Sequence, residues 1–108
     1  MPNPVKGVLA EELGNSNRLL RRYQQALEGL PPGSLVAKNI NGNVFYYRAR
    51  RVKGRLKFDY LGKLSKQEVA KFSEVKVKRA QYRRLIRDLR AQIRFIQRAL
   101  HERKRRSR

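Results

Sequence analysis

Regularly spaced basic side chains are the first feature of this sequence that could do chemistry. Seven of them follow one another at intervals of 3, 4, 4, 3, 4 and 4 residues: Lys76, Arg79, Arg83, Arg87, Arg90, Arg94 and Arg98. On an α-helix this spacing gives a nearly straight line about 33 Å long, roughly one turn of a nucleic-acid duplex. Arginine offers a planar fork that fits two phosphate oxygens. We call these seven residues the basic stripe and expect it to bind a phosphate backbone.

The alternative for the basic stripe is a solvated helix face or a site for an acidic protein. Solvated faces usually interleave acidic with basic residues four apart, because such pairs support the helix. Residues 70–108 hold only Glu74, Asp88 and Glu102 as acids. Like charges three and four apart oppose the helix by a few tenths of a kcal/mol per pair, about as much as opposite charges support it. This imbalance favours an anionic ligand over solvation.

A second basic cluster occupies a predicted hairpin and its turn. It contains Arg48, Arg50, Arg51, Lys53 and Arg55, with aromatic residues on the same strands. A basic sheet followed by a helix is one arrangement that reaches base edges in the major groove. Aromatic side chains between basic ones could also stack on unpaired bases. We expect Tyr46 to make such a contact, whereas Phe45, Tyr47 and Phe58 are interpreted as core residues.

Catalytic and metal-binding patterns are not found in the sequence. The chain has no Cys and one His, His101, which rules out thiol chemistry and Cys-ligated zinc. It has no Gly-rich phosphate loop and no His–carboxylate pair at catalytic spacing. The sequence therefore predicts a protein that is not an enzyme and uses no cofactor, metal or small-molecule substrate.

The net charge supports the same interpretation. The chain has 108 residues, with 28 Lys+Arg against 8 Asp+Glu and a formal net charge of +20. Residues 1–47 carry +2 and residues 48–108 carry +18. Such an excess favours a polyanionic partner. Because we find no apolar stretch of about 18 residues and no secretory signal, we expect a cytoplasmic protein without membrane contact.

The elements that must position these residues follow from periodicity. Apolar residues from Leu9 to Leu30 recur every three or four positions, with Ser16 filling one slot, and this spacing predicts a helix within residues 8–30. Because Gly14 and Asn15 have low helix propensity, the helix could instead start only at residue 15 or 16. Residues 35–40, 44–50 and 55–61 predict three strands, joined at Asn41-Gly42 and Lys53-Gly54. A capping box at Ser65 then begins a helix of up to about 40 residues.

The expected fold is α+β: an N-terminal helix, a three-stranded antiparallel β-meander and a long C-terminal helix. We expect this last helix to pack antiparallel on the first and to extend beyond it. Residues 1–102 would form a single domain, and residues 103–108 a disordered basic tail. A first helix of about 20 residues would leave part of the coiled-coil seam of the second uncovered. That part contains Leu89, Ile93, Ile96 and Leu100, and its exposure predicts a homodimer through these residues. The alternative is that the helix breaks near Ser73 and folds back to bury them within one chain.

Three motifs between residues 30 and 75 carry a resemblance. They are a Leu-Pro-x-Gly-Ser turn at residues 30–34, a Gly-x-x-Phe-Tyr-Tyr hairpin at residues 42–47 and a Tyr-Leu-Gly exit at residues 60–62. In these motifs the chain resembles a loosely defined group of small uncharacterised prokaryotic and phage proteins. The hairpin is more distantly similar to the sheet-type arm-binding domains of phage integrases. The resemblance implies a prokaryotic or phage origin and supplies no site residue. The last helix departs from the group by its high Arg content.

These observations predict a non-enzymatic nucleic-acid-binding protein, with DNA and RNA both open. One alternative is a phage or mobile-element inhibitor or adaptor that binds a host protein or ribonucleoprotein complex. Another is a ribosome-associated protein, because such proteins are also basic and have long helices. A partner that survives nuclease treatment would favour the first alternative, and co-sedimentation with ribosomes in high salt the second.

Overall fold

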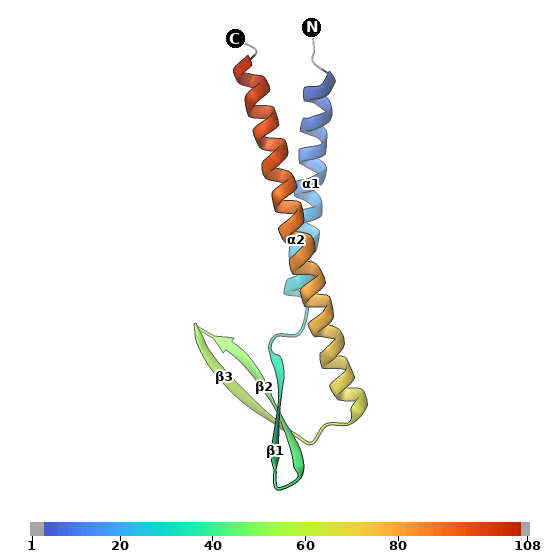
Figure 1. Cartoon of the computed structure of the whole chain (residues 1–108), viewed down its shortest axis with the longest axis vertical. Helices are drawn as coiled ribbons and strands as arrows, with labels where there is room; N and C mark the ends of the chain where they lie inside the picture. The colour runs from blue at the N-terminus through green and yellow to red at the C-terminus, as the bar shows by residue number, and fades with distance from the viewer. Residues whose placement is uncertain (1–3, 107–108) are drawn as a thin grey trace. The chain divides into compact units, whose positions relative to one another are not determined.

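The computed structural model describes residues 4–106 and contains the five predicted elements in the predicted order (Figure 1). These are α1 (Pro4–Glu28), β1 (Ser34–Ile40), β2 (Asn43–Val52), β3 (Arg55–Gly62) and α2 (Lys66–Arg106). Their contacts divide the chain into two compact units. Among the described residues, the first unit contains residues 4–29 and 81–106, and the second contains residues 30–80. The α+β class is confirmed, and the single domain over residues 1–102 stays a prediction.

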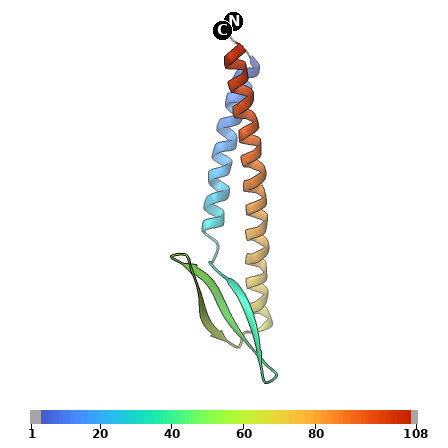
Figure 2. The ribbon, with the colours of Figure 1, turned by 60° about the vertical axis from the view of Figure 1, so that its left-hand side comes forward.

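The first unit is a pair of antiparallel helices, α1 and the C-terminal part of α2, which lie side by side in both ribbon views (Figures 1 and 2). Its contacts join Ser16 to Gln92 and Tyr23 to Tyr82, so the two helices run in opposite directions. The buried positions of α2 are the expected seam residues Ile86, Leu89, Ile93 and Ile96. Apolar burial at these positions stabilises the pair.

Helix α1 begins at Pro4, about ten residues before the later of the two expected starts. Proline suits the first position of a helix, because a backbone N–H at that position has no intrahelical acceptor and its absence therefore costs nothing. The helix continues through Gly14 and Asn15, although both have low helix propensity. Packing of the pair offsets this cost, because Ser16 in the following turn is only 2% exposed and accepts a hydrogen bond from Gln92.

Helix α2 is continuous over 41 residues, so the alternative of a break near Ser73 is wrong. Its start has the predicted capping box: the Glu68 N–H donates to Ser65 Oγ at 3.1 Å, and the Ser65 N–H donates to the Glu68 carboxylate at 3.4 Å. The helix runs to Arg106, so the expected disordered tail does not begin at residue 103. The last two residues of that expected tail, 107 and 108, lie outside the described residues.

The second unit contains the three-stranded antiparallel sheet, with strand order β1-β2-β3. Both hairpins have two-residue turns in which both residues have positive φ: 52° at Asn41 and 84° at Gly42, then 52° at Lys53 and 79° at Gly54. This is the primed turn that matches the right-handed twist of paired strands. A bulge lies between Tyr46 and Tyr47.

The two faces of the sheet differ in side chains and in burial. Paired residues share a face, so one face carries the row Val36–Tyr47–Tyr60 and the pairs Ala49–Phe58 and Arg51–Leu56. We call the apolar residues of this face the aromatic face: Val36, Phe45, Tyr47, Leu56, Phe58 and Tyr60. The opposite face carries Leu35, Tyr46, Arg48, Arg50 and Asp59, which are all half-buried.

The expected core role of the aromatic face is wrong for Phe58, which is 56% exposed. Phe45 and Tyr47 are half-buried. The reason is the position of α2, whose first turns lie beside the opposite face. A hollow there is lined by Leu35 of β1 and by Val69 and Phe72 of α2. The helix therefore covers the arginine-bearing face and leaves the aromatic one open.

Candidate nucleic-acid interface

A groove between α1 and α2 brings four residues of the basic stripe together. The groove has a volume of about 520 Å³, and we call it the arginine groove. Its α2 wall contains Arg83, Ile86, Arg87, Arg90 and Arg94, and its α1 wall contains Gln24, Leu27 and Glu28. The four arginines occupy positions i, i+4, i+7 and i+11 of α2, so helical periodicity puts them on one side. The buried Ile86 beside them belongs to the seam.

The charges of the arginine groove are largely uncompensated. All four arginines are exposed. Arg87 Nε lies 3.4 Å from Asp88 Oδ1, in a pair whose side chains are 74% and 67% exposed. Exposed pairs of this kind contribute little. Within residues 4–102, the guanidinium groups of Arg83, Arg90 and Arg94 have no carboxylate oxygen within 4 Å. The groove can therefore receive the oxygens of an anion.

Arg79 has a different environment from the rest of the basic stripe. Its guanidinium donates to the Pro31 carbonyl at 2.5 Å and to the Gly33 carbonyl at 3.2 Å. These bonds attach α2 to the turn before β1, and the side chain is half-buried. Arg79 also occupies the one polar position of the apolar seam, which was the sequence signal for this role. Lys76 is exposed and lines the hollow beside Leu35, and Arg98 is exposed on α2.

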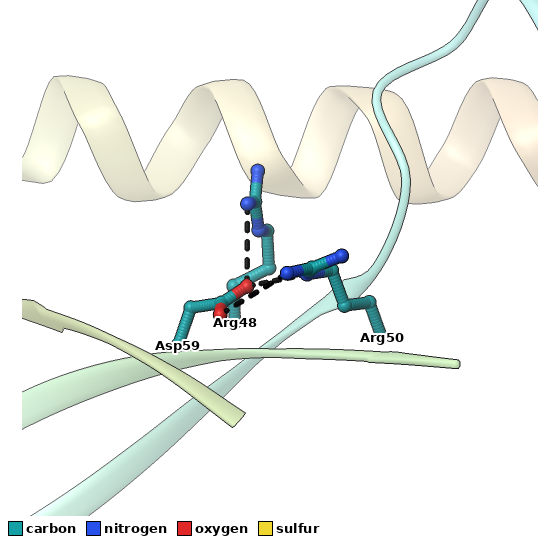
Figure 3. Close-up of polar contacts among 3 residues, drawn as sticks. All are labelled: Arg48, Arg50 and Asp59. Atoms are coloured by element: carbon teal, nitrogen blue, oxygen red, sulfur yellow. Dashed lines mark hydrogen bonds and ion pairs between the residues drawn. The ribbon is translucent and has the colours of Figure 1, made fainter. Parts of the chain in front are cut away.

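On the sheet, Asp59 is bonded to two of the predicted contact residues, Arg48 and Arg50 (Figure 3). Its carboxylate is 2.6 Å from Arg50 Nε and 3.3 Å from a terminal nitrogen of Arg48. The hydrogen bond from Arg50 lowers the pKa of Asp59, with Arg48 acting in the same direction, and Asp59 in turn raises the pKa of Arg50. Arg48 Nε is buried without a hydrogen-bond partner. These two arginines are therefore partly committed to the sheet.

The remaining basic residues of the hairpin are open to solvent. Arg51, Lys53 and Arg55 are exposed, and the guanidinium of Arg51 donates to the Gly54 carbonyl at 3.4 Å. Tyr46, the expected base contact, is half-buried on the same face as Arg48. Phe58, which was expected in the core, is exposed, whereas Tyr46 is not. Strict alternation of apolar and polar residues is the same for a covered and an open face, so the sequence held no signal to separate them.

The expected dimer residues are not an uncovered strip. Leu89 and Ile93 are each 7% exposed and Ile96 is 4% exposed, while Leu100 is half-buried. The reason is the length of α1, which at 25 residues reaches far enough along α2 to cover them. A homodimer through these residues would require α1 to separate from α2. Dimerisation itself stays a prediction.

Among residues 4–106 no three potential metal-ligating side chains lie together as a group. No helix in that range has the length and apolar character that a bilayer crossing requires.

Comparison with known families identifies the family to which this chain belongs. The chain is a member of a family described as a domain of unknown function, DUF6788, whose model matches residues 9–71. The match covers most of α1, the whole sheet and the first turns of α2, and it ends before the arginines of the groove. No curated protein and no solved structure matches the chain significantly.

Proposed function

We propose that this protein binds nucleic acid without catalysing a reaction, and that the arginine groove neutralises part of the phosphate backbone. The observation that carries the proposal is the convergence of Arg83, Arg87, Arg90 and Arg94 on one groove. Three of these four guanidinium groups have no ion pair among the described residues. A cytoplasmic location in a prokaryotic cell or a phage-infected host, which the resemblance implies, belongs to the same proposal.

Helix energetics support this proposal. The four arginines are spaced four, three and four residues apart, so each neighbouring pair repels. One carboxylate, that of Glu28, lines the groove beside them. An anion with regularly spaced charges relieves this repulsion when it binds. A phosphate backbone has such charges, and arginine binds each phosphate in a bidentate manner.

The sheet adds a second set of contacts in this proposal. Arg51, Lys53 and Arg55 are exposed around the second turn, and they can approach phosphates of a nucleic acid. Arg48 and Arg50 contribute less, because Asp59 neutralises part of their charge. We therefore expect the groove to supply most of the affinity.

Salt dependence tests the proposal directly. Fluorescence anisotropy with a labelled duplex of DNA, and separately of RNA, should give a logarithm of affinity that falls linearly and steeply with the logarithm of salt concentration. Six neutralised phosphates would give a slope of about −5 for B-DNA. Binding that does not change between about 50 and 300 mM salt would refute phosphate neutralisation. Any nucleic acid that co-purifies should be sequenced, and the protein should then be treated with nuclease before the titrations.

A further inference from the structure

The aromatic face of the sheet is an unusual surface for so basic a protein. Leu56, Phe58 and Tyr60 on β3 are 53%, 56% and 61% exposed, and Val36 on β1 is 38% exposed. Scattered apolar residues on a surface need no explanation, but a contiguous apolar patch normally marks an interaction site. These residues are contiguous, because the pairing of β1, β2 and β3 puts Val36, Tyr47 and Tyr60 in one row.

Three aromatic rings of this face contact one another in tilted geometries. The centroid of Tyr60 lies 5.2 Å from that of Tyr47 and 6.4 Å from that of Phe45, with interplanar angles of 56° and 40°. Such tilted contacts fix the rings without covering them. Phe58 lies opposite Ala49, whose small side chain leaves the neighbouring ring uncovered. The face thus presents aromatic surface on which a flat ligand can stack.

The charge around the aromatic face has one sign. Lys38 pairs with Phe45, and Arg51 pairs with Leu56, so both cations lie on this face; both are exposed. Residues 30–67 contain nine Lys+Arg and one acid, Asp59. Asp59 pairs in register with Arg48 on the opposite face, where it is bonded to two arginines. The aromatic face therefore has cations and no carboxylate.

We propose that the aromatic face binds single-stranded nucleic acid, with unpaired bases stacked on Phe58 and Tyr60 and phosphates near Lys38 and Arg51. This inference rests on the proposed function and names the form of nucleic acid that the sheet recognises. Bases of a duplex are already stacked on one another and cannot offer their faces, so the ligand must be unpaired. Stacking tolerates any base, and the sheet is expected to show little sequence preference.

Charge complementarity favours a polyanion over a second copy of the chain. Two copies pairing through this face would bring Lys38 and Arg51 of both copies into one interface, with no carboxylate on either face to compensate them. Each copy also has a net charge of +20. Repulsion between such surfaces opposes self-association, whereas a nucleic-acid strand neutralises them.

The test compares two probes of equal length and charge. One is an oligothymidylate of about 12 nucleotides, and the other is the same backbone with abasic sites in place of the bases. The protein should bind the first at least about 30-fold more tightly, since two stacked bases contribute that much. Emission of the tyrosines should be quenched by the oligothymidylate only, because the chain has no Trp and Tyr60 contacts the bases.

A double variant, Phe58→Ala with Tyr60→Ala, should bind both probes equally and weakly. A second double variant with Leu at both positions keeps apolar bulk on the strand but has no aromatic ring, and it should lose the preference for bases as well. Phe95→Ala is the matched control, because Phe95 is 64% exposed on α2 and lies in the other unit. It should leave both affinities unchanged.

The outcomes separate this inference from the proposed function. Equal binding of both probes by the unaltered protein would overturn the role of stacking, while salt-dependent duplex binding would still support the arginine groove. If neither probe nor a duplex binds at low salt, both proposals fail. If light scattering shows a dimer that the Phe58 and Tyr60 variants convert to a monomer, the face binds a second copy and the inference is wrong.

Discussion

Replacing the four groove arginines with glutamine should make the protein more stable and a weaker nucleic-acid binder at the same time. The variant carries Gln at positions 83, 87, 90 and 94, all exposed in the unaltered chain. Glutamine has nearly the same helix propensity as arginine, so the helix itself is not weakened. The change removes six like-charge pairs three or four residues apart, three within the set and one each with Arg79, Arg84 and Arg98. Each pair costs at least about 0.2 kcal/mol. We expect a gain of about 1 kcal/mol and a rise in Tm of about 4–8 °C.

The expected effect on binding follows from counterion release. Each neutralised phosphate of B-DNA contributes about 0.9 to the slope of log affinity against log salt concentration. If each of the four arginines neutralises one phosphate, the variant's slope is shallower by about 3.6. Between about 50 and 200 mM salt, the unaltered protein should then lose about 100-fold more affinity than the variant.

The assay needs a control with the same net charge. Replacing Lys6, Arg18, Arg21 and Arg22 with Gln also lowers the formal charge from +20 to +16, and all four lie exposed on α1 outside the groove. Anisotropy titrations at several salt concentrations give the slopes, and circular dichroism gives the Tm values. If the control reduces the slope as much as the groove variant does, net charge rather than the groove determines binding. A groove variant that keeps the full slope would refute the site.

Four further substitutions test turns, packing and an ion pair within the separate units. Gly33→Ala should lower the free energy of unfolding by about 2 kcal/mol and Gly42→Ala by about 1 kcal/mol, both measured by urea unfolding. Both glycines have positive φ, but a Cβ at Gly33 would lie 2.7 Å from a backbone oxygen, whereas the space at Gly42 is open. Equal losses in the two variants would contradict this reasoning. Ser16→Leu should destabilise the helix pair by about 1–3 kcal/mol, because Ser16 is buried where α1 and α2 meet, and an unchanged Tm would show room that the structure does not have. The pKa of Asp59 is lowered in the folded state, so its contribution to stability is present above the unfolded-state pKa and is lost as pH falls through the folded-state pKa. Asp59→Asn should remove this part of the acid transition in a pH titration followed by circular dichroism.

Local patterns in the sequence were sufficient for the elements of this fold. The seam of α2 follows from apolar spacing, the start of α2 from Ser65 and Glu68, and the two hairpins from Asn41-Gly42 and Lys53-Gly54. Each of these features depends on residues close together in the chain. For that reason their physical cause can be read without knowing what lies opposite them.

Features that depend on distant partners could not be predicted in the same way. The start of α1 depends on α2, since Gly14 and Asn15 alone argue for a shorter helix. The exposure of Phe58 and Tyr60 depends on which face of the sheet the helix covers. Periodicity identifies an apolar face but does not indicate its partner, and for this reason the core assignment of Phe58 was wrong.

The site of the four groove arginines could be predicted from the sequence only in part. Their spacing placed them on one side of a helix, and the structure adds the α1 wall with Gln24 and Glu28. Arg79 fits the same spacing but bonds to the backbone before β1. Its place in the apolar seam distinguishes it from the others.

The division of the chain into two units has a consequence for how the protein folds during synthesis. The sheet unit is one uninterrupted segment, and its strands pair through two-residue turns. The helix pair joins residues far apart, as in the bond between Glu12 and Gln92, which are 80 positions apart. Contacts between such distant residues form slowly, because the intervening chain must first be ordered. Of the five elements, α1 is therefore synthesised before the others and acquires its partner last, and a folded sheet shortens the segment that must close between α1 and α2.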